Sequence, residues 1–224
     1  MGRYGVRAAG KDRHAMGSAS FIRRRGVALV IAGPSGVGKS AIAQGLLALE
    51  PQAMLSVSVT TRMPRAGEVD GIHYDFRDRA AFDALLAEGE LLEWAEVFGE
   101  RYGTRRAPVV RALEEGRDAI FDIDWQGHRR LRAVLPGDVV GVVMLPAARR
   151  DLEARLAARG DPPERVASRM AGAWTEIEHW REFDHAVVNR DLGRSISAVR
   201  TILEAARLAT ARQTGLAELI AGLG

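Results

Sequence analysis

The chain has 224 residues, of which 47% are hydrophobic and 27% are charged, and it contains no cysteine. This composition is typical of one globular unit with a sizeable core, and the lack of cysteine excludes disulfides and thiolate metal sites. No apolar run is long enough to span a membrane, and the basic start lacks an apolar signal segment. We therefore expect a cytoplasmic protein with no membrane partner.

The formal net charge is +3, and the excess positive charge lies at the N-terminus. Residues 1–25 contain seven basic residues and one acidic residue, whereas the rest of the chain contains 25 basic and 28 acidic residues. A slightly acidic body argues against a nucleic-acid partner. We expect residues 1–25 to be a disordered tail, vector-derived or upstream of the true start, with Met16 as an alternative initiator.

The first predicted elements surround a phosphate-binding motif. Residues 27–32 are a wholly apolar run that predicts a buried parallel strand, and residues 41–50 follow a helical pattern. The segment between them matches G-x-x-x-x-G-K-[ST] at every fixed position, in the strand–loop–helix context that this motif requires. The predicted ATP-binding residues of this segment are Gly33, Pro34, Ser35, Gly36, Val37, Gly38, Lys39 and Ser40.

The chemistry of the motif fits its residues. Lys39 is one of only two lysines in a chain with thirty arginines, and a compact ammonium suits the β- and γ-phosphate oxygens better than a planar guanidinium does. Backbone N–H groups at the start of the helix would bind phosphate, and the Ser40 hydroxyl would bind Mg²⁺.

Further along the chain, apolar strands alternate with helices. Strands are expected at residues 119–123, 139–145 and 186–189, and helices at 126–134, 149–159, 164–180 and 192–212. This alternation predicts an α/β fold with a parallel sheet covered by helices on both faces. The predicted core comprises residues 26–55 and 106–224.

Residues 56–105 interrupt the alternation with a polar, irregular stretch. Short strands are expected at 56–60 and 74–76, and a helix at 79–88. Because ligands of parallel sheets bind at the carboxyl ends of the strands, this stretch is predicted to be an inserted substrate-binding region. Within it, Arg62 and Arg65 flank a proline, and two guanidinium groups on a short rigid segment suit a phosphate dianion. Two solvated loop arginines are the alternative.

These motifs, taken together and in order, make the chain similar to the guanylate kinases from about residue 26 to 215. The matching segments are residues 33–40, 60–68, 71–74, 92–94, 102–104, 122–127, 155–160 and 188–189. The resemblance implies a P-loop NTPase-type sheet with an inserted mixed α/β GMP-binding region and a helical lid at 150–175. It also implies Mg²⁺-dependent transfer of the ATP γ-phosphoryl group to GMP, so the expected partners are ATP and GMP.

The resemblance also assigns the acceptor site. The GMP phosphate would be bound by Arg62, Arg65, Tyr74 and Tyr102, and the guanine by Ser58, Glu93, Thr104 and Asp124. Guanine presents N1–H and N2–H₂ as adjacent donors that a carboxylate such as Glu93 accepts, whereas adenine would leave that carboxylate unpaired. A surface acid beside Trp94 is the alternative for Glu93.

The remaining assignments concern ATP, magnesium and the lid. Asp122 ends a strand and is expected to contact Mg²⁺ through water, while Asp124 could serve guanine, a magnesium water or the N-cap of the next helix. Asn189 matches a residue near the adenine of ATP. The predicted catalytic residues are Lys39, Arg155, Arg159 and Arg169.

Two other functions remain open at this stage. One is a non-catalytic guanylate-kinase-like binding module, against which the intact phosphate loop argues. The other is a related kinase that acts on a sugar phosphate, against which the guanine and GMP-phosphate residues argue. The oligomeric state and the use of dGMP stay open as well.

Overall fold

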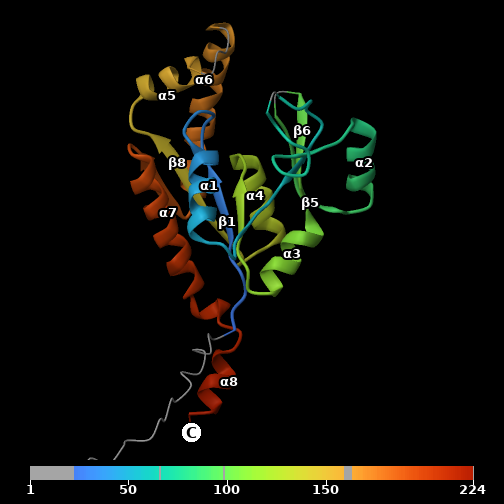
Figure 1. The fold of residues 1–224 in the computed structure, drawn as a ribbon, viewed down its shortest axis with the longest axis vertical. Coiled ribbons are helices and arrows are strands. Elements are labelled where there is room, and N and C mark those ends of the chain that lie inside the picture. Colours follow the sequence, from blue (N-terminus) through green and yellow to red (C-terminus); the bar gives the residue numbers. More distant parts are fainter. Residues whose placement is uncertain (1–22, 66, 98, 159–162, 224) are drawn as a thin grey trace, which may run out of the picture.

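The computed structural model describes residues 23–65, 67–97, 99–158 and 163–223, and the statements below concern these residues. Figure 1 shows the elements, several of which are labelled. The strands are β1 Ala28–Ala32, β2 Met54–Leu55, β3 Ser58–Thr60, β4 Asp75–Phe76, β5 Leu91–Val97, β6 Glu100–Arg105, β7 Ala119–Asp122, β8 Val139–Pro146 and β9 His185–Asn189. The helices are α1 Lys39–Leu49, α2 Arg79–Ala87, α3 Arg106–Glu114, α4 Trp125–Val134, α5 Arg149–Ala157, α6 Pro163–Glu178, α7 Leu192–Arg207 and α8 Leu216–Ala221, with 3₁₀ turns at His179–Glu182 and Thr210–Arg212.

The larger sheet has five parallel strands in the order β2-β7-β1-β8-β9. The wholly apolar β1 lies at its centre because both faces of the strand are covered. Leu29 and Ile31 pack in one core cluster with residues of α1, α5, α6 and α7, whereas Val30 packs on the other face with residues of α3 and α4. This arrangement confirms the predicted parallel sheet with helices on both faces.

The smaller sheet has the order β4-β3-β6-β5, and its strands all come from residues 58–105. β6 pairs antiparallel with β3 and β5. A small core beneath it is formed by Val59, Phe82 of α2 and Leu91. β5 and β6 were not expected from the sequence, because their charged residues hide the alternation of a strand.

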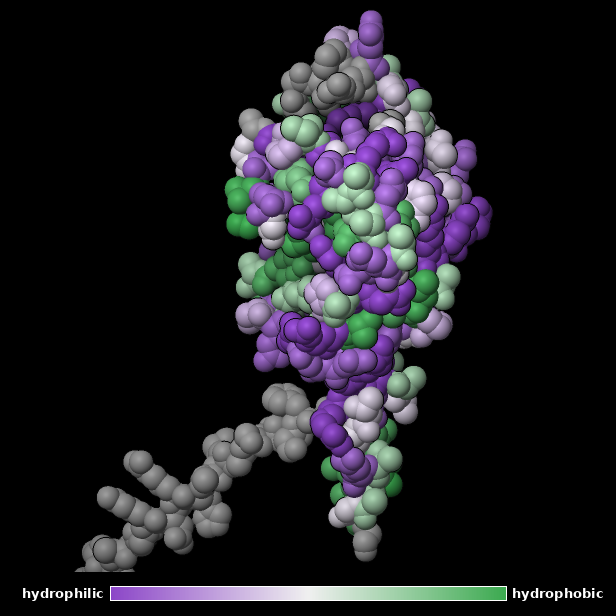
Figure 2. All heavy atoms as spheres, turned by 90° about the vertical axis from the view of Figure 1, so that its right-hand side faces the viewer, coloured by the Kyte–Doolittle hydropathy of each residue, from purple (hydrophilic) through white to green (hydrophobic). Residues whose placement is uncertain are grey.

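The two ends of the molecule differ in character. The helices α5 and α6, where the lid is predicted, and the small sheet stand at the same end, on either side of the start of α1 (Figure 1). α8 projects from the opposite end, and Figure 2 shows hydrophobic residues on it beneath a largely hydrophilic face. Within the part of the chain that the structure describes, no helix is long and apolar enough to cross a membrane.

The expected helix at 192–212 is wrong at its C-terminal end. α7 ends at Arg207, and a separate turn and the unexpected α8 follow. The cause is Arg212, whose guanidinium is almost fully buried and donates to the carbonyl oxygens of Gly26 and Asp138 at 2.9 Å each. A continuous helix would not bring this side chain under the sheet, where unsatisfied donors would be costly.

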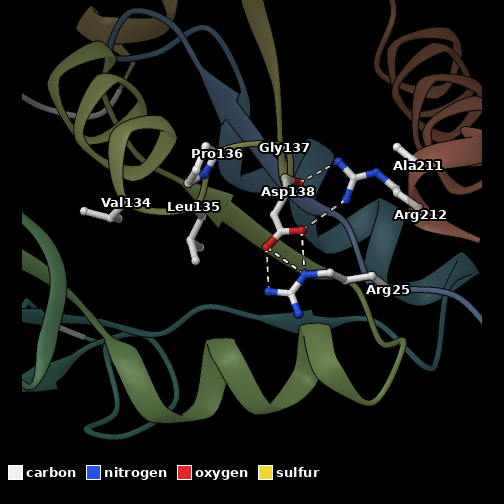
Figure 3. Close-up of a pocket in the computed structure, with 8 residues that line it drawn as sticks. All are labelled: Arg25, Val134, Leu135, Pro136, Gly137, Asp138, Ala211 and Arg212. Carbon is white, nitrogen blue, oxygen red and sulfur yellow. Dashed lines mark hydrogen bonds and ion pairs between the residues drawn. The ribbon is translucent and has the colours of Figure 1, made fainter. Parts of the chain in front are cut away.

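Two arginines predicted to lie in the tail instead pack near Arg212, at the N-terminal end of the parallel strands. Arg25 forms a bidentate ion pair with Asp138, beside Arg212, in a cavity of about 380 Å³ (Figure 3). Arg24 forms an ion pair with the buried Asp118. Arg23 forms an exposed ion pair with Glu218, and residues 1–22 of the predicted tail, including Met16, lie outside the described residues.

Candidate functional site

The phosphate loop connects β1 to α1, and its glycines are required by its shape. Gly33, Gly36 and Gly38 all have positive φ angles, between 87° and 131°. A Cβ atom at Gly33 would lie 2.3 Å from the carbonyl oxygen of Met144, so no other residue fits there. The loop therefore turns tightly against β8 directly before the N-terminus of α1, the kind of place where backbone N–H groups bind phosphate.

Lys39 and Ser40 begin α1. Lys39 Nζ donates to the carbonyl oxygen of Gly33 at 2.6 Å, and Ser40 Oγ donates to Asp122 Oδ2 at 2.5 Å. The serine–aspartate contact follows from the parallel register that sets Ile31 of β1 beside Asp122 of β7. The lysine ammonium is thus held over the loop, and a hydroxyl and a carboxylate meet beside it.

The donor set of Ser40 and Asp122 fits magnesium. Mg²⁺ usually takes one or two protein oxygens and completes its octahedron with waters and phosphate oxygens. Among the described residues, no group of three or more acidic or histidine side chains could hold a metal by itself. A serine hydroxyl and one carboxylate next to a phosphate loop are compatible with a metal that arrives with a nucleotide.

The middle of the phosphate loop is anchored by two distant side chains. The Val37 carbonyl oxygen accepts a 2.7 Å hydrogen bond from Asn189 Nδ2 and a 3.2 Å hydrogen bond from Arg155 Nη1. Asn189 is buried, and its Oδ1 accepts from Ser195 Oγ at 2.9 Å. The structure thus places Asn189 against the loop itself, where it fixes the loop's conformation.

Three of the predicted guanine-binding residues lie abreast on adjacent strands. Ser58 of β3 pairs with Thr104 of β6, which in turn pairs with Glu93 of β5. The register slips by one residue between Leu91 and Glu93, and such a bulge re-aims a side chain. Leu91 therefore packs in the small core, Leu92 packs in the main core, and Glu93 faces α4.

Glu93 is a buried carboxyl group with a shifted acidity. Burial raises its pKa to about 7, the charge of Asp124 adds to the rise, and a hydrogen bond from Thr104 and the charge of Arg130 oppose it. Asp124 caps α4, since its Oδ1 accepts from the Gly127 N–H at 2.9 Å. Glu93 and Asp124 thus lie near each other at the N-terminus of α4. Asp124 caps this helix through one oxygen, Oδ1, so its other oxygen can still bind a ligand.

The predicted phosphate ligands gather around Arg62. Its guanidinium donates to Glu68 Oε1 at 2.8 Å and lies 5.1 Å from the centre of the Tyr74 ring. The Tyr74 and Tyr102 rings meet edge-on, with centroids 6.1 Å apart. Arg65 is exposed, and its backbone N–H donates to Glu68 Oε2. Glu68 was not predicted as a site residue, although it lies in one of the matching segments. Its carboxylate binds both Arg62 and the backbone of Arg65, and therefore orients these two residues.

The lid residues are only partly placed. Arg155 lies in the last turn of α5 and donates to the Val37 carbonyl oxygen, and Arg169 lies on α6, while Arg159 lies outside the described residues. Sequence reasoning missed Glu176, which is half-buried on α6. Burial raises the pKa of Glu176 to about 7, and the charges of Asp124 and Asp122 also raise it while that of Lys39 lowers it. Glu176 is thus near enough to Lys39 and to both aspartates for their charges to act on it.

Comparison with known proteins identifies the family. The guanylate kinase family model matches residues 25–206. The chain belongs to the guanylate kinase family. A guanylate kinase of Gluconobacter oxydans is 59% identical over 199 residues, which cover 88% of this chain and 96% of that protein. A guanylate kinase of Granulibacter bethesdensis is 57% identical, over 90% and 94% of the two chains.

Solved structures agree. The crystal structure of guanylate kinase from Anaplasma phagocytophilum superposes with a TM-score of 0.76 at 35% identity and covers 89% of this chain and 95% of that one. These findings confirm the P-loop NTPase-type fold and the assignment to a nucleoside monophosphate kinase. They favour the guanylate kinase hypothesis over a non-catalytic binding module or a sugar-phosphate kinase.

Proposed function

We propose that the chain transfers the γ-phosphoryl group of ATP to GMP in a Mg²⁺-dependent reaction that yields ADP and GDP. The observation that carries the choice of acceptor is the buried Glu93, pinned by Thr104 and abreast of Ser58 in the small sheet. A carboxylate at this point accepts from both N1–H and N2–H₂ of guanine, which no other common base offers. Asp124 lies close enough to contribute to the same site.

ATP would lie with its phosphates on the loop. Backbone N–H groups of the phosphate loop would bind the β-phosphate, and Lys39, now folded onto the Gly33 carbonyl, would turn to the β- and γ-phosphate oxygens. Ser40 would hold Mg²⁺ directly and Asp122 through water, and the bound ion would neutralise charge on the transferred group. Asn189 contributes to ATP binding by fixing the loop through Val37.

The GMP phosphate would lie across from the ATP phosphates and would be bound by Arg62, Arg65, Tyr74 and Tyr102. Arg62 already has an aromatic and carboxylate environment that fixes its plane, and Arg65 is exposed to solvent. An oxygen of this phosphate is itself the nucleophile, so neither a covalent intermediate nor a general base is required. The protein's task is alignment and charge neutralisation.

The lid arginines complete the site. Arg155, Arg159 and Arg169 would approach the transferred phosphoryl group when the lid closes over ATP and stabilise its charge in the transition state. Closure also excludes water, so ATP hydrolysis without GMP should be slow. The absence of cysteine supports a cytoplasmic location.

The test is an ADP-release assay with ATP and Mg²⁺ and with GMP, AMP, CMP, UMP or a ribose phosphate as acceptor. We expect turnover with GMP far above that with every other acceptor, and almost no ADP release without acceptor. Lys39→Ala should abolish turnover while leaving the thermal melting profile unchanged. Turnover with a sugar phosphate alone, or binding of GMP without any turnover, would contradict the proposal.

A further inference from the structure

The acceptor site contains a glycine in an unfavourable place. Gly127 is the third residue of α4, and in a helix interior glycine costs up to roughly 1 kcal/mol relative to alanine. Its φ angle lies outside the positive region occupied by the loop glycines. The helix backbone therefore does not require glycine at this position, and the reason must lie in what surrounds it.

The surroundings leave too little space for a methyl group. A Cβ atom at position 127 would lie 3.2 Å from Glu93 Oε2, 3.1 Å from Ile123 Cδ1 and 3.3 Å from Ile123 Cβ. Contacts between ordinary neighbours begin near 3.4 Å. Ile123 Cδ1 is the end of a flexible side chain and can turn aside, but Ile123 Cβ is fixed to the backbone that leads into α4. An alanine methyl group would therefore be pressed towards Glu93 Oε2, whose carboxylate would have to give by a few tenths of an ångström.

The carboxylate cannot move freely either. Its other oxygen, Oε1, accepts the 2.7 Å hydrogen bond from Thr104. Pushing Oε2 away from α4 would rotate the carboxylate about this anchor and tilt its plane. The Gly127 N–H, in turn, donates to Asp124 Oδ1 at 2.9 Å, so this residue binds one acid of the predicted guanine site while a side chain here would reach the other.

We propose that Gly127 is a positioning residue for guanine selection, because its missing side chain keeps Glu93 Oε2 in the plane where the base presents its second donor. This inference rests on the proposed role of Glu93. Guanine needs both carboxylate oxygens, one for N1–H and one for N2–H₂, whereas hypoxanthine offers N1–H alone. Displacing one oxygen therefore removes the advantage of the 2-amino group and leaves the rest of the site intact.

The test is Gly127→Ala, with kcat/KM measured for GMP and for IMP, whose base lacks the 2-amino group. We expect kcat/KM for GMP to fall about tenfold, the effect of one charge-assisted hydrogen bond. The fall should lie in the KM for GMP, with the KM for ATP unchanged and kcat/KM for IMP much less affected. The alanine retains the N–H that Asp124 accepts, so the melting temperature should not fall.

A double-mutant cycle with Glu93→Gln separates this inference from the proposed function. In the Glu93→Gln background, Gly127→Ala should not change the GMP-to-IMP preference further, because both changes act on the same carboxylate. The matched control is Gly222→Ala at the end of α8, where the added Cβ would meet only ordinary contacts of 3.5 Å; it should leave every constant unchanged.

Each remaining outcome is decisive. An unchanged preference in Gly127→Ala, or an equal fall for GMP and IMP, would overturn the role of Gly127. An additive effect in the cycle would also overturn it, because Gly127 would then act on another group. If Glu93→Gln itself left the preference unchanged, the assignment of Glu93 to guanine would fail instead.

Discussion

Thr104 Oγ1 donates a 2.7 Å hydrogen bond to Glu93 Oε1, and both side chains are buried. A hydroxyl has a single proton to donate, so while this bond stands Thr104 cannot also donate to an acceptor on the guanine. If the proposed guanine site is right, Ser58, which lies beside Thr104 on β3, is the hydroxyl that would donate to O6 or N7 of the base. The two hydroxyls predicted to bind guanine would then have different roles.

Binding of GMP should depend on pH through Glu93. Only the ionised carboxylate can accept two hydrogen bonds from guanine, and burial raises the pKa of Glu93 to about 7. The KM for GMP should be constant well above pH 7 and should rise as pH falls, approaching tenfold for each unit below pH 7. The measurement is the KM for GMP between pH 5.5 and 9.

The matching control is Glu93→Gln, which lacks the titration. Its KM should be high at every pH and vary only with the ionisation of the GMP phosphate, which both enzymes share. The difference between the two profiles isolates Glu93. Parallel profiles for the two proteins would show that Glu93 does not titrate in the binding step.

A second prediction concerns the anchor of the phosphate loop. Asn189→Leu removes the 2.7 Å hydrogen bond to the Val37 carbonyl and leaves Ser195 without its acceptor. We expect a loss of about 1–3 kcal/mol in the free energy of unfolding. The KM for ATP should rise by about tenfold, with little change in that for GMP, because the loop no longer presents its N–H groups in one geometry.

Ser195→Ala is the matched variant, with a smaller expected effect. It leaves the hydrogen bond from Asn189 to Val37 in place and should raise the KM for ATP less than Asn189→Leu does. Initial-rate kinetics with each substrate varied in turn would measure both variants. An unchanged KM for ATP in Asn189→Leu would mean that the loop keeps its shape without this anchor.

The sequence predicted the parts of the site that are local. The phosphate loop could be recognised because its conformation depends on three glycines within six residues, and the apolar β1 because it is buried on both faces. Asp124 as an N-cap was also visible, since the acid directly precedes a helical pattern. In each case the determining residues lie within one or two turns of one another.

The parts that failed depend on contacts between distant segments. Nothing near Asn189 indicates that its amide binds Val37, 152 residues earlier in the chain. The break after α7 depends on Arg212 reaching Gly26 and Asp138. Likewise, the need for glycine at position 127 appears only when β5 is placed against α4.

A third prediction tests the base of the sheet. Asp118 is 2% exposed and accepts from Arg24, from the Val27 N–H and from Arg207. Asp118→Asn should lower the free energy of unfolding by about 3 kcal/mol, because it removes the buried charge that pairs with two partly buried guanidinium groups. Since the residue precedes β7 and Asp122 ends it, kcat and both KM values should stay unchanged.

Glu115→Gln is the matched control for this variant. Glu115 pairs with Arg117 at 2.6 Å, but both side chains are 40% exposed or more, and exposed pairs contribute little. Denaturant unfolding of the three proteins would give the comparison. Equal stabilities for Asp118→Asn and Glu115→Gln would contradict a structural role for the buried pair.

The last prediction concerns His128, which is buried in α4 with its ring stacked on Phe183 at 4.1 Å. Among the residues that the structure describes, neither ring nitrogen has a hydrogen-bond partner. Nε2 lies 2.4 Å from where a Cβ atom of Gly141 would be. Burial lowers the pKa of His128 to about 4; the charge of Arg132 lowers it further, and those of Asp184 and Glu182 raise it.

The sign of the pH dependence follows from this shift. The unfolded chain takes up the proton near pH 6.5, but the folded protein does so only near pH 4. The stability associated with neutral His128 is therefore fully present above pH 6.5 and is lost as pH falls towards 4, by about 3 kcal/mol in all. His128→Leu removes this titration together with the two unpaired nitrogens.

Unfolding by denaturant at several pH values between 7 and 4 would measure the effect. The stability of His128→Leu relative to the unsubstituted protein should increase steadily over this range, although acid destabilises both through their carboxylates. His185→Gln, at an exposed histidine of β9, should follow the unsubstituted protein at each pH. If the free energy of unfolding of His128→Leu also changed with pH in parallel with that of the unsubstituted protein, protonation of His128 would not oppose folding. The ring would then have to be hydrated or hydrogen-bonded in the native state.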